Sequence, residues 1–306
     1  MMFHKFFILI ICLFVSVFLT SSVNAATDYW MMTDLGTSAR MIGYGGVEGF
    51  GSSADTVFEN PAGLYRIRQN SVSLFTTRLG GEVGYFNGSM ATRTPWGVFA
   101  VGYMHASVGD IPHTGEDDNG RFFAEYNFDY KNTIVRGSYG YSFSDRLHVG
   151  GSLSQYTNTF DGVSGRGYDL DLGAVYIYDR YQFSGLIRNV MNSEVDYGSN
   201  GKEELGRQYT LSAKAQVIPQ VDVMAQVKYS YDEPTYAGGV VYSPTLIPYL
   251  KASAGFKQFV TLADVEDTVV LGFMLDFSDV EFHYTYEKSD HVTYDNKNYF
   301  SVSVKF

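Results

Sequence analysis

From about residue 71 onward, the chain alternates between apolar and polar residues in segments of about ten residues. The last segment shows the pattern clearly, since the apolar residues Phe300, Val302, Val304 and Phe306 alternate with Ser301, Ser303 and Lys305. Successive side chains of a β-strand point to opposite faces, so each segment has one apolar and one polar face. Beyond residue 25, the longest nearly unbroken apolar run (269–275) is far too short for a membrane helix.

We count fourteen alternating segments and predict one strand for each. Their ranges are approximately 71–78, 82–92, 96–106, 133–143, 147–160, 167–178, 182–190, 209–217, 221–230, 235–243, 249–258, 268–277, 280–288 and 298–306. A soluble β-sandwich also alternates, but long segments with aromatic residues near their ends are typical of outer-membrane barrels. Because a lipid core offers no water to backbone groups, such a sheet has to close on itself. The sequence therefore predicts an all-β membrane barrel of about 14 antiparallel strands.

The composition agrees with an exported barrel and excludes other classes. Aromatic residues make up 16% of the chain, with 32 glycines and only 7 prolines. The one cysteine, Cys12, lies near the N-terminus, so the remainder has neither a disulfide framework nor thiolate chemistry. The net charge of −11 leaves no basic surface for nucleic acid, so no nucleic-acid partner is expected.

The first 25 residues are expected to be a secretory signal peptide. Lys5 precedes an almost purely apolar stretch (6–19), and small residues gather at 21–25. This order of charge, apolar stretch and small residues is typical of a cleaved signal. The apolar stretch is short for a membrane anchor, and the bulky residues before Cys12 disfavour a lipoprotein.

Residues 26–70 do not alternate and are rich in glycine. They lack the GxGxxG spacing and the βαβ context of a phosphate-binding loop, so no cofactor is expected. Ser52 or Ser53 can cap a short helix over residues 54–59, after which Asn60-Pro61 can begin another turn. A barrel of this size has room for a compact, partly helical segment in its lumen or at its periplasmic mouth. We therefore predict a signal peptide (1–25), a plug segment (26–70) and a transmembrane barrel (71–306).

The connections predict the orientation of the barrel. Several turns after even-numbered strands are tight, namely those at Pro95, Ser144-Asp145, Asp179-Arg180 and Ser278-Asp279. Several connections after odd-numbered strands are long and polar, namely residues 107–132, 191–208, 260–267 and 289–297. Bacterial outer-membrane barrels place short turns in the periplasm, so both termini are expected there. Phe306, which ends an amphipathic segment, resembles the C-terminal signal that the outer-membrane assembly machinery reads.

Residues 36–46 and 53–64 resemble the N-terminal signature of the PorV/PorQ and FadL-like outer-membrane proteins. Family members read like A-R-x-x-G-M-G-G and then D-A-x-A-x-x-x-N-P-A-G-L. The residues that carry the resemblance are Arg40, Gly45, Gly46, Ala54, Asn60, Pro61, Ala62, Gly63 and Leu64. Two positions depart from the pattern, because Ser53 stands where Asp is usual and Thr56 replaces the second alanine.

The resemblance implies a fourteen-stranded barrel that holds a plug, and it implies two alternative functions. FadL-like members take up long-chain fatty acids or other hydrophobic molecules through the lumen and a lateral opening in the wall. PorV-like members carry substrates in type IX protein secretion. We expect a FadL-like channel for small hydrophobic molecules such as fatty acids in the bacterial outer membrane, with the secretion component as the alternative. A general porin is disfavoured because a plug would obstruct free diffusion.

The polar positions of the strands offer no catalytic or metal site. The inward-facing charges are Arg136, Asp169, Asp171, Asp222, Lys228, Glu281 and His283. No Ser-His-Asp or metal-ligand spacing is visible among them, so we expect them to pair within the lumen and expect no enzyme activity. The acidic cluster Glu116, Asp117 and Asp118 lacks the spacing of a calcium-binding loop and is expected to be a solvated loop.

Overall fold

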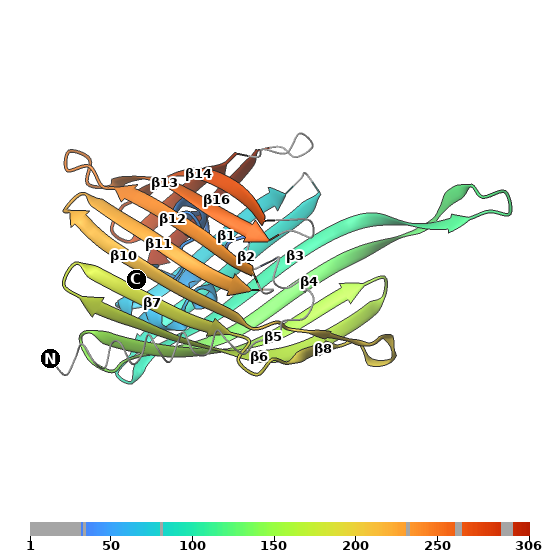
Figure 1. The fold of residues 1–306 in the computed structure, drawn as a ribbon, viewed down its shortest axis with the longest axis horizontal. Helices are drawn as coiled ribbons and strands as arrows, with labels where there is room; N and C mark the ends of the chain where they lie inside the picture. The colour runs from blue at the N-terminus through green and yellow to red at the C-terminus, as the bar shows by residue number, and fades with distance from the viewer. Residues whose placement is uncertain (1–31, 33–34, 80–81, 231–232, 261–264, 289–295) are drawn as a thin grey trace.

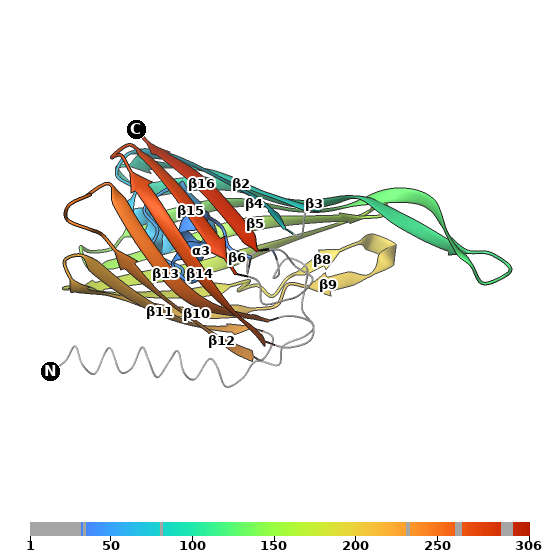
Figure 2. The same cartoon turned by 90° about the horizontal axis from the view of Figure 1, so that it is seen from above.

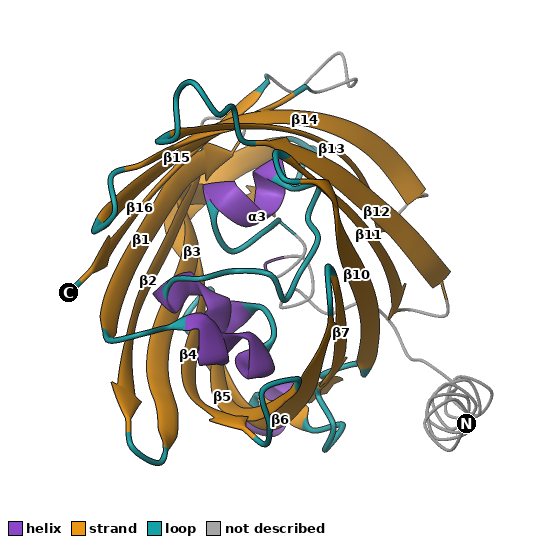
Figure 3. Cartoon of the chain, turned by 90° about the vertical axis from the view of Figure 1, so that its left-hand side faces the viewer, coloured by secondary structure: helices purple, strands orange, loops and turns teal. Residues whose placement is uncertain are grey.

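The computed structural model describes residues 32, 35–79, 82–230, 233–260, 265–288 and 296–306. Within these ranges, fourteen long strands form one closed antiparallel barrel (Figures 1 and 3). They are β1 (Asn70–Leu79), β2 (Val83–Thr94), β3 (Gly97–Glu116), β4 (Phe122–Ser142), β5 (Leu147–Phe160), β6 (Val163–Tyr178), β7 (Tyr181–Arg188), β10 (Gln208–Ile218), β11 (Val221–Ser230), β12 (Glu233–Tyr242), β13 (Leu250–Val260), β14 (Val265–Asp276), β15 (Val280–Glu287) and β16 (Lys297–Lys305). Successive long strands pair with one another, and β1 pairs with β16 to close the ring. The predicted fourteen-stranded barrel is confirmed, whereas the predicted signal peptide (1–25) lies outside the described residues.

The two faces of β16 show how the alternation specifies the barrel. Ser301 and Ser303 are buried against the interior, and the Ser303 hydroxyl shares a hydrogen bond of 2.8 Å with Ser73 of β1. Val304 and Phe306 point outward and are 37% and 59% exposed. The predicted assignment of polar residues to the lumen and apolar residues to the outside is therefore confirmed for this strand.

An apolar belt surrounds the outside of the barrel. On β4 its members are Val135, Tyr139 and Tyr141, with Phe143 just beyond the strand, all exposed. At about 3.3 Å per residue and a tilt of about 40°, residues 133–143 rise roughly 25 Å, which is the height of the lipid-facing band of an outer-membrane barrel. We call this band the belt.

The tight turns lie where the sequence predicts them, at one end of the barrel. Phe143 and Phe277 donate backbone hydrogen bonds of 2.9 Å to Leu147 and Val280 across two of these turns. Asp179 and Ser278 have positive φ angles of 54° and 68°, as residues in such turns often do. We call this end of the barrel the short-turn end.

Two connections predicted as loops contain strands. Residues 107–132 are largely the outer halves of β3 and β4, which run on as a two-stranded ribbon far beyond the barrel (Figures 1 and 2). Residues 191–208 contain the short hairpin β8 (Glu194–Asp196) and β9 (Lys202–Glu204), with the 3₁₀ turn η3 (Gly198–Asn200) between them. The prediction was wrong because it required an apolar outward face, which a strand no longer needs once it leaves the belt.

The N-terminal segment lies inside the barrel, towards the short-turn end (Figure 3). It contains α3 (Ala39–Gly43), η1 (Ala54–Phe58) and η2 (Pro61–Arg66), and we call residues 35–69 the inner segment. Its apolar side chains pack on inward-facing residues of the wall, forming a core that includes Ile42, Val57, Phe58, Leu64, Phe75, Tyr85, Met104 and Ile134. Within the described ranges, no helix is long and apolar enough to cross a membrane.

The predicted helix over residues 54–59 is a 3₁₀ helix, and its cap differs from the prediction. Ser53 holds the N-cap position, but its hydroxyl donates to the Asp55 carboxylate at 2.8 Å and does not cap the helix. Asn60 does cap η2, since its Oδ1 accepts a hydrogen bond from the Ala62 amide at 2.9 Å. Pro61 follows at the first helical position, where its missing N–H costs nothing.

Candidate functional site in the barrel interior

Glycines of the wall mark where the second half of the inner segment docks. A Cβ on Gly150 would lie 2.5 Å from the carbonyl carbon of Pro61, and one on Gly140 would lie 2.9 Å from the Pro61 oxygen. A Cβ on Gly173 would lie only 1.9 Å from Oδ1 of Asn60. Adjacent strands β4, β5 and β6 therefore expose bare backbone, and the Asn60–Ala62 turn lies directly on it.

A second glycine contact docks the end of α3 on the opposite part of the wall. A Cβ on Gly45 would meet the Gly238 oxygen at 2.2 Å, and one on Gly255 would meet the Gly45 nitrogen at 2.4 Å. Gly45 also has a φ of 75°, which L side chains rarely adopt. Gly46 shares that conformation, with a φ of 76°, but the nearest atom to its Cβ would be 3.6 Å away. Position 45 therefore requires glycine because a Cβ would collide with the wall and because φ is positive. Position 46 requires glycine only because φ is positive.

Asn60 joins the inner segment to two strands of the wall. Its Nδ2 donates to the Ser184 hydroxyl at 2.9 Å, to the Gly185 oxygen at 3.0 Å and to the Ala174 oxygen at 3.3 Å. The residue is fully buried. One side chain thus caps η2 and fastens it to β6 and β7.

Arg40 holds the two halves of the inner segment together. Its Nη2 donates to Asp55 Oδ2 at 2.8 Å and to Glu59 Oε1 at 2.5 Å. The second carboxylate oxygen of Glu59 accepts from the Gly49 amide at 3.0 Å. All of these side chains are buried, so the ion pairs are shielded from solvent and fix α3 against η1.

Glu48 connects the inner segment to the wall at β7 and at β11. Its carboxylate contacts Arg188 of β7 and lies 3.0 Å from Nζ of Lys228 on β11. Its backbone N–H donates to Gln226 Oε1 at 2.8 Å. Arg188 in turn donates to the Phe58 oxygen at 2.9 Å, so one buried anion and one buried cation bridge β7, β11 and η1.

Of the inward-facing charges predicted to pair, all but Asp169 contact an acidic or basic side chain. Arg136 lies 3.0 Å from Asp171, and Lys214 lies 2.7 Å from Asp222. Glu281 contacts both Lys305 and His283, the latter at 3.5 Å. The remaining acid, Asp169, accepts backbone hydrogen bonds from Leu170, Met191 and Ser193.

The acidic cluster at the tip of the ribbon is a turn. Oδ1 of Asp117 accepts hydrogen bonds of 2.9 Å from the amides of Asn119 and Arg121. Within the described residues, no group of three or more His, Cys, Asp or Glu side chains is arranged to hold a metal ion. The carboxylate of Asp117 therefore stabilises the tip itself.

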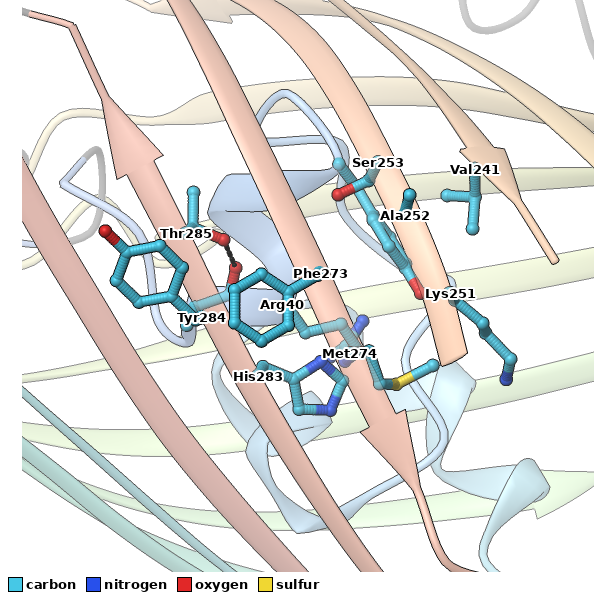
Figure 4. Close-up of a pocket in the computed structure, with 12 residues that line it drawn as sticks. Arg40, Val241, Lys251, Ala252, Ser253, Phe273, Met274, His283, Tyr284 and Thr285 are labelled. Atoms are coloured by element: carbon cyan, nitrogen blue, oxygen red, sulfur yellow. Dashed lines mark hydrogen bonds between the residues drawn. The ribbon is translucent and has the colours of Figure 1, made fainter. Parts of the chain in front are cut away.

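Two cavities lie beside α3. The first, drawn in Figure 4, has an empty volume of about 210 Å³ between Arg40 and inward-facing residues of β13–β15 such as Ser253, Met274 and His283. Above it the Thr285 hydroxyl donates to the Ala39 oxygen at 2.6 Å. The second has an empty volume of about 480 Å³ and lies between Met41 and Ile42 on one side and β11–β13 on the other.

The structure divides the motif residues between two docking sites. The first group, Gly45 and Gly46, lies against β12 and β13. The second group, Asn60, Pro61 and Ala62, lies against β4–β7. Arg40 links the two groups through its ion pair with Glu59. Gly63 packs within the segment, where its Cβ would lie 2.8 Å from a methyl group of Thr56. Sequence reasoning missed Glu48, Arg188 and the wall glycines. A glycine at an inward-facing position of an alternating strand is the signal that could have found the last group.

Comparisons with known proteins place the fold. No family model and no curated protein matches the chain. Among solved structures, the chain is similar to the monoaromatic hydrocarbon channel CymD, with a TM-score of 0.64 and 12% identity over 90% of this chain and 99% of that one. It is also similar to the Pseudomonas putida toluene transporter TodX, with a TM-score of 0.61 and 13% identity over 88% and 97% of the two chains. For a Pseudomonas aeruginosa FadL homologue the TM-score is 0.53, with 11% identity over 86% and 97%. At these identities the likeness concerns the fold, which is that of an outer-membrane β-barrel.

Proposed function

We propose that the chain is an outer-membrane channel for small hydrophobic molecules, that it is not an enzyme, and that the inner segment is its plug. The observation that carries the proposal is a closed barrel whose interior is occupied by a segment docked at two sites, with cavities beside α3. Three solved structures with the same fold are described by name as a monoaromatic hydrocarbon channel, a toluene transporter and a FadL homologue, and the first two names support this class of solute.

The proposal includes the orientation of the barrel in the membrane. The belt would contact outer-membrane lipid, and the short-turn end, which carries the C-terminus, would face the periplasm. Phe306 is 59% exposed and pairs by two backbone hydrogen bonds with Asn70, at the start of β1. The proposal includes the outer-membrane assembly machinery as a partner that reads Phe306 before these two hydrogen bonds form.

The proposed route lowers the free energy of an apolar solute. Transfer from water to lipid is favourable by about 25 cal/mol per Å² of apolar surface, so a solute that enters the barrel is drawn towards the lipid phase. Ions gain nothing comparable from lipid, and the inner segment occupies the barrel interior with buried ion pairs. We therefore expect high uptake of apolar solutes and low ionic conductance.

Two measurements on the full-length protein test the proposal. In vesicles with a lipopolysaccharide outer leaflet, which slows the passive entry of hydrophobic molecules, the protein should accelerate the uptake of radiolabelled toluene. In a planar bilayer it should conduct poorly, and a variant without residues 26–70 should conduct well. Normal gel mobility of the folded barrel is the control for assembly.

The results separate the alternatives. Equal conductance of both forms would show that the inner segment is not a plug. An absence of accelerated uptake would remove the channel function and leave the type IX secretion component, which co-purification with exported proteins would then test.

A further inference from the structure

The connection between β12 and β13 differs from the charged turns at the short-turn end. It spans residues 243–249, which include Pro244, Leu246, Ile247 and Pro248 but no charged side chain. Three other turns at this end carry charges, namely those with Asp145 and Arg146, with Asp179 and Arg180, and with Asp279. All of these turns lie at the same end of the barrel (Figure 1). One stretch of this end is therefore apolar where comparable turns are charged.

The side chains of this connection extend away from the protein. Leu246 is 96% exposed, which is the largest exposed fraction of any large hydrophobic side chain in the described ranges. The other residues of 245–249, including Ile247 and Pro248, are exposed as well. Contact between apolar side chains and water is unfavourable, and contiguous apolar exposure marks interaction surfaces. The connection therefore has the composition of a surface that another molecule covers.

The turn between β10 and β11 adjoins this connection and has the same character. Gln220 joins the two, because its backbone oxygen accepts from the Ser243 amide at 2.8 Å and its Nε2 donates to Oγ1 of Thr245 at 3.2 Å. Just before Gln220, Val217 and Ile218 are 55% and 52% exposed. The two turns thus form one surface, which we call the apolar end patch and which consists of Val217, Ile218, Pro219, Leu246, Ile247 and Pro248.

The apolar end patch continues the belt. On β12, the outward-facing side chains of Tyr236, Val240 and Tyr242 are exposed down to the last residue of the strand. At the next strand, exposed Tyr249 stacks on exposed Phe277 with ring centroids 5.7 Å apart. Tyrosine is enriched where a membrane meets water, so these rings mark the level of the lipid headgroups. The patch begins at this level and extends beyond it.

The charged side chains near the patch do not separate it from the belt. Lys214 of β10 lies 2.7 Å from Asp222 of β11, and Lys251 of β13 lies 3.2 Å from Asp276 of β14. Lys251 lines the first cavity beside α3, and Lys214 shares the strand face of buried Ser212. Both pairs therefore lie on the lumen side of the wall, and the outer surface remains apolar from the belt to the patch.

The size of the patch favours lipid over a protein as the molecule that covers it. A stable protein interface takes about 20–30 residues from each partner, and this patch consists of two short turns. A lipid leaflet sets no such minimum, because the patch only enlarges a surface that the lipid already contacts. Apolar side chains at the edge of a membrane protein bury themselves at the boundary between headgroups and acyl chains.

We propose that the apolar end patch is a lipid anchor in the periplasmic leaflet, which draws the β10–β13 side of the barrel further into the membrane than the side with the charged turns. A hydrophobic surface that is taller on one side than on the other is accommodated by tilt. The inference goes beyond the proposed channel function. It rests on the proposed membrane orientation and does not require transport.

The first experiment measures how deeply the patch lies in lipid. Cys12 is the only cysteine of the chain, so Leu246→Cys and Asp145→Cys in a Cys12→Ser background each provide one labelling site for an environment-sensitive fluorophore. The labelled full-length protein is inserted into vesicles of phosphatidylethanolamine and phosphatidylglycerol. A phospholipid with a nitroxide near the top of its acyl chain should quench the fluorophore at position 246. A water-soluble nitroxide on both sides of the membrane should quench the fluorophore at position 145.

Two results of this experiment would overturn the anchor. One is equal quenching by the lipid nitroxide at both positions, and the other is quenching at position 246 by the water-soluble nitroxide alone.

The second experiment tests whether Leu246 holds the neighbouring turn in lipid. The fluorophore is placed at position 218 by Ile218→Cys, and Leu246→Asp is compared with Ser144→Asp, which adds the same charge to a charged turn. The first variant should lose most of the quenching by the lipid nitroxide, because a carboxylate is costly to bury at the lipid boundary. The second should leave the quenching unchanged, and equal quenching in both would overturn the proposal. Normal gel mobility of the folded barrel is the control for assembly.

The outcomes separate this inference from the proposed function and from a protein partner. Lipid quenching at position 246 without accelerated uptake of toluene would contradict the channel function and support the anchor. Accelerated uptake without lipid quenching there would do the reverse. A cross-link from position 246 to a periplasmic protein in whole cells, without lipid quenching in vesicles, would overturn the anchor and identify a protein interface.

Discussion

The inner segment is attached to the wall in two different ways on its two sides. Towards β4–β7, side chains add to the backbone contacts at the wall glycines, chiefly through Asn60 and the Arg188 contacts with Phe58 and Glu48. Towards β12–β15, backbone lies on backbone at Gly45, and Thr285 adds one hydrogen bond to Ala39. Both described cavities lie on this second side. Under the proposed function, the first side would anchor the segment and the solute would pass on the second.

The largest effect is expected where one side chain joins the first side to β11, the strand that borders the second side. Glu48→Ala removes the carboxylate that contacts Arg188 and Lys228, and leaves two cations in a buried site. Loss of one partner of a buried ion pair costs about 3–5 kcal/mol. Urea unfolding in lipid vesicles should show this loss, and planar-bilayer conductance should rise. Glu194→Ala, at an exposed ion pair with Lys202, is the control and should change stability by less than about 1 kcal/mol.

Asn60→Asp tests the anchored side. The substitution keeps the oxygen that caps η2 but places an unprotonated carboxylate against the carbonyls of Gly185 and Ala174. We expect a loss of about 2–4 kcal/mol at pH 8, because a buried donor is replaced by a charge without a partner. Burial raises the pKa of the introduced carboxyl in the folded state, so its protonated form restores the donor and stability should recover as the pH falls towards 4. A variant equally unstable at both pH values would show that Asn60 does not anchor the segment through these carbonyls.

Gly45→Ala tests the second side, with Gly46→Ala as the matched control. Both glycines have nearly the same positive φ, so the conformational strain of about 1 kcal/mol is common to both variants. Only at Gly45 would the new Cβ also collide with a wall carbonyl, so we expect a further loss of about 1–3 kcal/mol there. Protease cleavage within residues 35–50 should increase for the first variant only. Similar cleavage of both would mean that the backbone contact contributes nothing.

Thr285→Val should have the smallest effect. It keeps the shape of the side chain and removes the hydrogen bond to the Ala39 oxygen, at a cost of about 1 kcal/mol. Because α3 is loosened without a collision, toluene uptake should rise modestly while ionic conductance stays low. A drop in uptake would place the solute path on the anchored side and reverse the comparison.

The wall was predictable because lipid imposes a period of two on every strand within the belt. The predicted ranges 147–160 and 221–230 coincide with β5 and β11 as observed. The ribbon was missed because the search required apolar residues outside, whereas residues 126–131 of β4 alternate with the opposite polarity and β3 pairs with β4 through two register shifts. Asn60 was predictable as a cap because its partner is two residues away. The Glu48–Arg188 contact joins residues 140 apart in the sequence, and no local pattern signals a pair that only barrel closure brings together.

The pairing of β16 with β1 has a consequence for the order of assembly. The inner segment directly precedes β1, and the hydrogen bond between Ser73 and Ser303 spans 230 residues, so this seam is the most non-local contact of the wall. Contacts of such separation form late, because the whole intervening chain has to be in place first. Asn60 and Glu48 are buried between the inner segment and the wall, and the segment is continuous in sequence with β1. We therefore expect the inner segment to lie within the curved sheet before β16 pairs with β1. The strands of the wall would then assemble around the inner segment.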